Sequence, residues 1–141
     1  MNSHKKSRIL AFQALYAWEA QKKRITVESL LEFPWLDEPP DEETKVSTRL
    51  LVTGVVENIK SIDETLSAHF ENWAFSRVAR VDLAIMRMSA YSLMFQKDVP
   101  ASVVISSAIA ISRKFGADDS FRFINGVLDA VRKTVQGERE I

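Results

Sequence analysis

Cationic side chains crowd the beginning of the chain. His4, Lys5, Lys6 and Arg8 follow one another closely, and a helix would place them on about one and a half turns. Cations at a helix N-terminus are mildly destabilising, because the helix dipole is already positive there. A sequence that accepts this cost is expected to use the positive charge, for example to bind phosphate. From charge alone, a solvated and frayed terminus explains the pattern equally well.

A second group mixes cations with aromatic rings near the end of the chain. Its members are Arg113, Lys114, Phe115, Gly116, Asp119, Ser120, Phe121, Arg122 and Phe123. Aromatic faces stack on unpaired bases while Arg and Lys hold the backbone, so this combination suits single-stranded RNA. The alternative is a corner between two helices, in which Phe115 and Phe123 are core residues and the charges only cover them. On the residues alone, that alternative is preferred.

The sequence contains no recognisable catalytic or metal-binding pattern. There is no cysteine, His4 and His69 stand apart, and the four glycines cannot form a phosphate-binding loop. Neighbouring carboxylates such as Glu42 and Glu43 are better explained by helix capping and the helix dipole. We therefore expect a protein that is not an enzyme and that needs neither metal nor cofactor.

Length and composition indicate one domain covering residues 1–141, with 46% hydrophobic residues and a formal net charge of zero. The neutral total hides an uneven distribution. Residues 1–24 hold six basic residues and one acidic residue, whereas residues 28–43 hold seven acidic residues and no basic one. The lack of cysteine and of any apolar run near the ~20 residues of a membrane span leads us to expect a cytoplasmic protein without a membrane segment.

Hydrophobic residues recur at helical spacing in almost every segment, which predicts an all-α fold. We expect helices over residues 3–21 and 26–33, a third from about Pro40, and a fourth from the capping box of Ser61 and Glu64 to about 70. Ser76 would cap the fifth, Gly116 would end the sixth, and the last would begin at 119 or 120. The fifth should be the most buried, and the first should be a buried rod with a wet, positive tip.

Four blocks of sequence resemble one family. They read FQALYAWE, RVARVDLAIMRMSAYSL, DVPASVVISSAIAISRKFGADDS and FINGVLDAV, in that order along nearly the whole chain. They are similar to the NusB family of bacterial transcription antitermination factors. The resemblance implies a domain of about seven helices in two subdomains. It further implies binding of the single-stranded RNA element boxA together with ribosomal protein NusE, within the transcription elongation complex on ribosomal RNA operons, and a homodimer in some members.

The resemblance also implies roles for individual residues. The RNA-binding residues would be His4, Lys5, Lys6, Arg8, Phe115, Asp119, Arg122 and Phe123, although the family's N-terminus is richer in arginine. The surface facing NusE would involve Tyr16 and Asp82, whose carboxylate we expect to point outward. Ser106 and Ser107 depart from the family pattern, which usually has asparagine and glutamate there.

Two alternatives remain at this stage. The basic N-terminus is sparse, so the chain could be a protein-interaction module that has lost RNA binding. The same helical domain also occurs at the N-terminus of RNA cytosine-5 methyltransferases. Because the sequence ends at Ile141, no room remains for a methyl-donor domain, so we expect the antitermination factor.

Overall fold

The computed structural model describes residues 3–70 and 75–140, with side chains for 4–70 and 75–137. Within these ranges the chain forms helices and no strand, which confirms the predicted all-α class. The elements are α1 (Ser3–Ala20), α2 (Val27–Leu30), α3 (Glu42–Glu57), α4 (Ile59–Ser67), the 3-10 helix η1 (Phe75–Arg77), α5 (Arg80–Phe95), α6 (Ala101–Phe115) and α7 (Ser120–Glu140). None of the described helices is long and apolar enough to cross a membrane.

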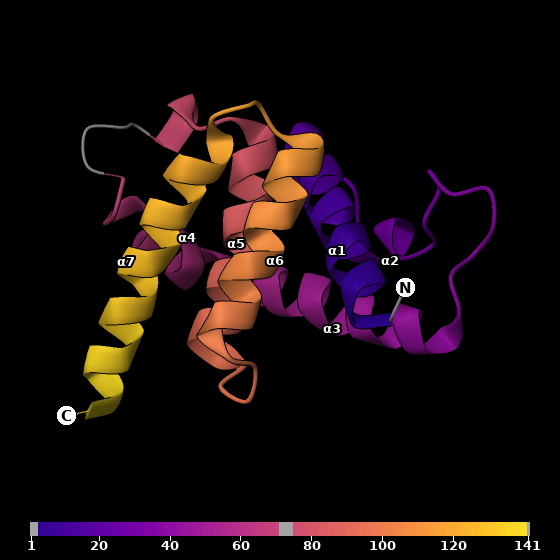
Figure 1. Cartoon of the computed structure of the whole chain (residues 1–141). Coiled ribbons are helices and arrows are strands. Elements are labelled where there is room, and N and C mark those ends of the chain that lie inside the picture. The colour runs from indigo at the N-terminus through magenta and orange to yellow at the C-terminus, as the bar shows by residue number, and fades with distance from the viewer. Residues whose placement is uncertain (1–2, 71–74, 141) are drawn as a thin grey trace.

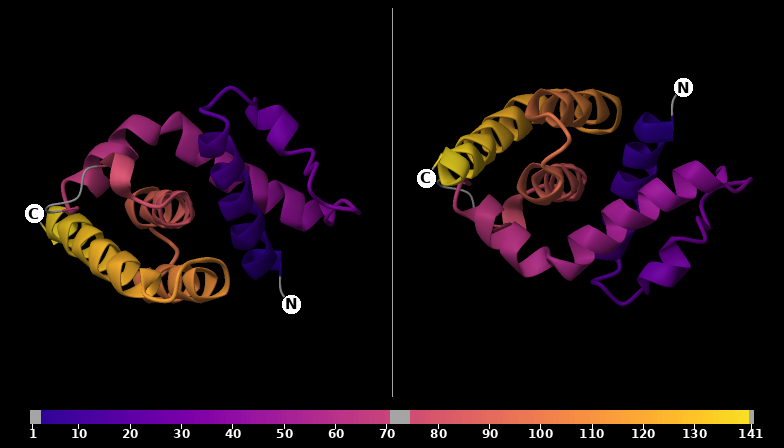
Figure 2. Two further views of the ribbon diagram at one scale, coloured as in Figure 1. Left: turned by 90° about the horizontal axis from the view of Figure 1, so that it is seen from above. Right: turned by 90° about the horizontal axis from the view of Figure 1, so that it is seen from below.

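Helix α5 is the centre of the fold. Seen end-on in Figure 2, it lies in the middle of the molecule with α4, α1 and the antiparallel pair α6 and α7 around it. Eleven of its side chains are buried, including Ile85, Met86 and Met88, which are fully enclosed. This confirms that the fifth helix is the most buried. The helix is enclosed because it has neighbours around it, and its buried side chains include four polar ones, those of Asp82, Arg87, Ser89 and Ser92.

The helices form two groups that meet at α5. Helices α1 to α3 pack together at one end of the molecule, and α4 to α7 make up the other, as Figure 1 shows. Helix α1 contacts both α3 and α5, so its middle is enclosed: Ala11, Ala14 and Leu15 are buried. The two-subdomain arrangement is therefore confirmed, with α1 and α5 forming much of the contact between the groups.

A buried arginine ties three helices together. Nε and Nη2 of Arg87 on α5 donate to the two carboxylate oxygens of Asp63 on α4, at 2.9 and 2.8 Å, and Nη1 donates to Glu19 on α1 at 3.0 Å. The guanidinium also lies over the rings of Trp18 and Phe75, 5.8 and 5.5 Å from their centroids. This bidentate, stacked geometry is one that arginine can supply and lysine cannot.

Two predicted helix caps are wrong. Helix α4 begins at Ile59, so Ser61 lies inside it and its hydroxyl donates to the carbonyl of Asn58 instead of capping the helix. Ser76 lies within η1, and α5 begins after Ala79 without a side-chain cap. A serine with a glutamate three residues later fits an exposed helical turn as well as a cap, so the motif alone cannot fix the boundary.

Other helix ends agree with the sequence. Helix α3 begins one residue after Asp41, whose carboxylate accepts from the backbone N–H of Thr44 at 2.8 Å, so Pro40 precedes the cap. Helix α6 ends before Gly116, and α7 begins at Ser120, as expected. The short connection between them makes a tight corner.

Candidate RNA and protein interface

The basic residues at the start of α1 point in different directions. Successive side chains on a helix are rotated by about 100°, so neighbours in sequence reach different surroundings. His4 and Lys5 face α6, whereas Lys6 lies near Asp41 at the start of α3. Hydrogen bonds from Thr44 are the main reason why the pKa of Asp41 is lowered, and the charge of Lys6 lowers it further.

Arg8 is inside the protein, and its placement on a wet tip is wrong. It is 1% exposed, and its Nη1 donates to the hydroxyl of Ser92 on α5 at 3.1 Å. That hydroxyl donates in turn to Gln96, while Nε and Nη2 of Arg8 have no hydrogen-bond partner. Burial lowers the pKa of Arg8 to about 10, so it remains charged at neutral pH. As packed here, its guanidinium cannot contact a phosphate on the surface.

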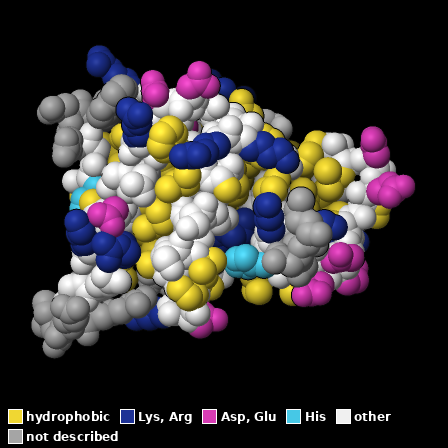
Figure 3. Space-filling model, in the orientation of Figure 1, with side chains coloured by type: hydrophobic (Ala, Val, Ile, Leu, Met, Phe, Trp, Pro, Cys, Tyr) yellow, Lys and Arg dark blue, Asp and Glu magenta, His cyan; other side chains and the backbone are white. Residues whose placement is uncertain are grey.

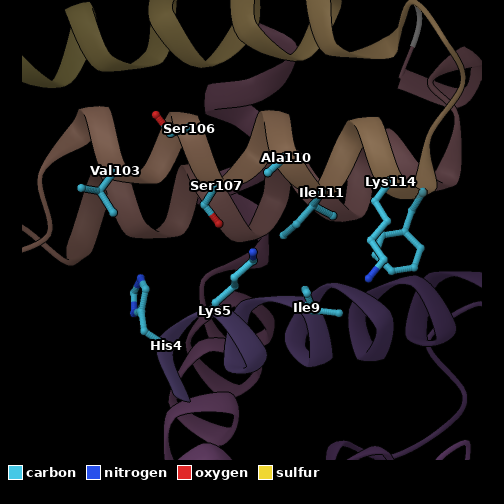
Figure 4. A pocket seen from close by; sticks show the side chains of 10 residues that line it. His4, Lys5, Ile9, Val103, Ser106, Ser107, Ala110, Ile111 and Lys114 are labelled. Atoms are coloured by element: carbon cyan, nitrogen blue, oxygen red, sulfur yellow. The ribbon is translucent and has the colours of Figure 1, made fainter. Parts of the chain in front are cut away.

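A groove of about 340 Å³ runs between the start of α1 and α6; we call it the cationic groove. It is lined by His4, Lys5, Ile9, Val103, Ser106, Ser107, Ala110, Ile111, Lys114 and Phe115. Figure 4 shows Lys5 and Lys114 extending into it from opposite helices. No lining residue is acidic, because Ser107 stands where the family resemblance leads us to expect a glutamate. The groove therefore combines two lysines with an apolar floor.

The corner between α6 and α7 carries three cations held on aromatic rings. The guanidinium carbons of Arg113 and Arg122 lie 4.7 and 5.6 Å from the centroid of the Phe121 ring. Nζ of Lys114 lies 5.4 Å from the centroid of Phe115. Such contacts hold long side chains in place while their charges stay at the surface. In Figure 3, Lys and Arg side chains gather along this face of α6 and α1 and toward the corner.

Phe115 and Phe123, the two phenylalanines considered as core residues, differ. Phe123 is half-buried and packs its ring 5.9 Å from that of Phe70, in agreement with a core role. Phe115 is 36% exposed, although its ring contacts Phe12 at 5.3 Å, so its assignment to the core is wrong. Asp119 is exposed at the same corner. The corner thus presents the exposed ring of Phe115, exposed cations and a carboxylate together.

A second groove, of about 370 Å³, opens on the other side of Phe115; we call it the aromatic groove. Its lining is mostly apolar and consists of Phe12, Gln13, Tyr16, Ala17, Trp35, Val81 and Phe115. The indole N–H of Trp35 donates to the side-chain oxygen of Gln13 at 2.9 Å. Sequence reasoning identified Tyr16 and missed Trp35, which lies in the irregular segment after α2. Only the folding of that segment onto α1 brings the two rings to one groove.

Asp82 is buried, so the expectation that its carboxylate points outward is wrong. It lies in the first turn of α5, where the start of α7 covers it and Ser120 donates a hydrogen bond to it. Burial raises the pKa of Asp82, and the hydrogen bond from Ser120 partly opposes that shift. Its Oδ1 has no hydrogen-bond partner. The carboxylate holds the α6–α7 corner through Ser120 and is not a charge at the edge of a partner surface.

The fold and these surfaces define a helical binding protein with a cationic and an aromatic groove side by side. Within the described ranges no group of three or more His, Cys, Asp or Glu residues could hold a metal ion. The family model for the NusB family matches residues 5–133, and the chain belongs to that family.

Comparison with individual proteins agrees with this family assignment. The transcription antitermination protein NusB of Treponema pallidum is 51% identical over 132 residues, which covers 92% of each chain. The structure of NusB from T. maritima superimposes with a TM-score of 0.86 at 33% identity, covering 98% of this chain and 97% of that one. Transcription antitermination proteins are non-catalytic factors, and this chain is accordingly not an enzyme.

A third comparison concerns an assembly. A crystal structure of the antitermination factors NusB and NusE in complex with double-stranded RNA contains a chain that matches with a TM-score of 0.81 at 22% identity, covering 95% of this chain and 98% of that one. At this level of identity, the likeness shows the fold alone.

Proposed function

We propose that this chain is an RNA-binding transcription antitermination factor that binds boxA-type single-stranded RNA together with ribosomal protein NusE. In that role it joins the transcription elongation complex and supports processive transcription of ribosomal RNA operons in the cytoplasm. The observation that carries the RNA assignment is the cationic groove, into which Lys5 and Lys114 extend from opposite helices and whose walls hold no carboxylate. The names of the relatives and the NusB–NusE–RNA assembly support the biological setting.

The groove and the corner suit different parts of a nucleotide. Lys5 and Lys114 supply ammonium groups for backbone phosphates in the groove, and Arg122 adds a planar guanidinium at the corner. Lys6 adds a further cation outside the groove, toward the start of α3. The exposed face of Phe115 offers a platform for an unpaired base. Asp119 can accept a hydrogen bond from an exocyclic amino group, which is how carboxylates recognise bases such as cytosine.

The other RNA-facing residues act less directly in this proposal. Arg8 contributes a buried positive charge without touching phosphate, and Phe123 anchors α7 against Phe70. His4 lines the cationic groove, where its ring nitrogens can form hydrogen bonds. Contacts to RNA therefore centre on Lys5 and Lys114.

For NusE we propose the aromatic groove beside Tyr16. Tyrosine and tryptophan side chains commonly dominate protein interfaces, and the groove has both. Asp82 contributes by holding Ser120 and hence the corner that forms one wall of the groove. A homodimer through this surface is the competing use of the same groove.

One observation also favours a second function. Among the N-terminal cations Lys5, Lys6 and Arg8, only Lys5 lines the cationic groove. A protein-interaction module without RNA binding would tolerate that loss of charge. The two functions differ in one measurable property, which is salt-sensitive affinity for RNA.

A fluorescence anisotropy titration with labelled boxA-like RNA at several salt concentrations tests the proposal. Four cations that neutralise about four phosphates on a single strand predict a log–log salt slope of roughly −3. Replacing Lys5 and Lys114 together by alanine should weaken binding at least fivefold and reduce the slope to about −1.5. Because both side chains are exposed, the melting temperature should stay unchanged.

The matched control is the double variant Lys60→Ala with Arg49→Ala, which removes two exposed cations from α4 and α3. It should bind RNA like the wild type, apart from a small long-range effect. If the control and the groove variant lose affinity equally, the groove is not the binding site. Absence of RNA binding by the wild type would favour the protein-interaction module.

A further inference from the structure

The segment after α2 holds Trp35 in a fixed position at the edge of the aromatic groove. Phe33 takes a left-handed backbone conformation, with φ at 54°, and buries its ring, which turns the chain back toward α1. The ring of Trp35 meets that of Phe33 edge-on at 5.7 Å, while its indole N–H is bound to Gln13. Trp35 nevertheless stays 37% exposed, close to the value of 38% for Tyr16. Trp35 is thus held in place, and both rings leave part of their surface uncovered.

The chain that continues from Trp35 is strongly acidic. Residues 37–43 hold five carboxylates, those of Asp37, Glu38, Asp41, Glu42 and Glu43, and no basic residue occurs between 28 and 43. We call this segment the acidic loop, although its last two residues form the start of α3. All five side chains are exposed. In Figure 3, acidic side chains gather at the end of the molecule where this loop and the start of α3 lie, next to hydrophobic side chains. The surroundings of the aromatic groove on this side are therefore opposite in charge to those of the cationic groove.

We propose that Trp35, Tyr16 and the acidic loop together form a docking surface for a basic segment of a protein partner. The alkyl stem of a lysine or arginine would lie against the two rings, and its charged head would reach Asp37 and Glu38. Aromatic faces attract cations, and rigid Trp and Tyr side chains lose little entropy on binding. This inference rests on the proposed function, because it specifies which part of the chain NusE meets and what chemistry NusE must present.

The charge of the acidic loop decides between the occupants. Its carboxylates repel phosphates, so RNA is disfavoured on this side of Phe115. A basic partner gains twice, since its cations are steered to the loop over a distance and then neutralise it on contact. A second copy of the chain also offers a basic segment, the residues around Lys5. If that segment bound the acidic loop of another copy, the protein would associate with itself.

Isothermal titration calorimetry with purified NusE and the full chain tests the inference. We expect Trp35→Ala to weaken NusE binding at least tenfold, and the double variant Asp37→Lys with Glu38→Lys to weaken it at least tenfold at low salt but less at high salt. The double variant changes only exposed loop residues, so it remains informative even if Trp35→Ala lowers stability. Both variants should bind boxA-like RNA at least as well as the wild type.

The matched control reverses two other exposed charges, Glu57→Lys with Glu64→Lys, at the end of α3 and on α4. It should reduce NusE affinity less than twofold at high salt. If the wild type binds NusE and the loop variants bind within twofold of the control, the docking inference is overturned while the proposed function stands. A wild type that binds RNA but no NusE overturns the assigned partner and the docking inference together.

Sedimentation velocity of the protein alone completes the experiment. A monomer over the calorimetric concentration range supports a hetero-partner at this surface. A dimer that the Asp37→Lys with Glu38→Lys variant dissociates would overturn the inference in favour of a second copy.

Discussion

Arg87 is the residue whose replacement should unfold this protein most readily. Arg87→Met keeps an unbranched apolar stem of similar reach and removes three hydrogen bonds, two to Asp63 and one to Glu19. Breaking a buried ion pair from one side costs about 3–5 kcal/mol, because the partner charge is left unpaired. The side chains of Asp63 and Glu19 are each 24% exposed, so water can partly rehydrate them. We therefore expect Arg87→Met to lower the free energy of unfolding by about 3 kcal/mol, the lower end of that range.

Thermal unfolding followed by circular dichroism measures the effect directly. For a chain of this length, 1 kcal/mol corresponds to roughly 3–4 °C in melting temperature, so Arg87→Met should melt about 10 °C below the wild type. Arg87→Lys should fall between the two, since it keeps a charge and loses the bidentate geometry. Arg49→Met on the exposed surface of α3 is the control and should shift the melting temperature by no more than about 2 °C.

A double-mutant cycle shows whether the ion pair is the cause. In the Asp63→Asn background one of the two carboxylates that Arg87→Met leaves unpaired is already neutral, so Arg87→Met should cost at least 1 kcal/mol less than in the wild type. Equal costs in the two backgrounds, or a wild-type melting temperature for Arg87→Met, would refute the reasoning and leave Arg87 as a packing residue.

Three further predictions concern buried groups. Arg8→Met removes one hydrogen bond, to Ser92, together with two buried nitrogens, Nε and Nη2, that have no partner, so the melting temperature should stay level or rise. A loss above about 2 kcal/mol would show that the charge is compensated. The raised pKa of Asp82 means that the folded state holds its proton more tightly, so stability falls as pH rises from near 3.8 through the raised value. The difference in melting temperature, Asp82→Asn minus wild type, should therefore be larger at pH 7 than at pH 3.5. A difference that does not change with pH would contradict the burial of the charge. Gly54→Ala would place a methyl group inside the space of the Tyr91 ring, so it should destabilise by about 1–3 kcal/mol; Tyr91→Ala in that background should cost less than in the wild type, and additive losses would exclude the clash.

The sequence predicts the helices well, because their periodicity is repeated over several turns. The spacing of Ala84, Ile85 and Met88 identifies α5 and its burial, and Gly116 with Ser120 places the α6–α7 corner. Helix boundaries depend on single residues and are less certain from sequence. The motif at Ser61 shows this, since its hydroxyl binds a carbonyl within the helix and α4 begins two residues earlier.

The candidate site shows a clearer limit. Residue type predicts that Arg8 and Asp82 are exposed, and both are buried because other helices cover them: α5 meets Arg8, and the start of α7 meets Asp82. Trp35 was missed because the residues next to it in the sequence do not indicate that its ring reaches Tyr16. Exposure of a polar or aromatic side chain is a property of the packed helices, and local sequence carries little information about it.

Phe115 belongs to both grooves, since its ring forms part of the wall of each. If RNA and NusE occupy the two grooves as proposed, both ligands contact the same ring. The ring position that one ligand favours is then the position that the other ligand meets, so the two binding reactions are linked. Linkage is reciprocal: the factor by which NusE tightens RNA binding must equal the factor by which RNA tightens NusE binding. A single side chain would in this way let the protein sense that both ligands are present.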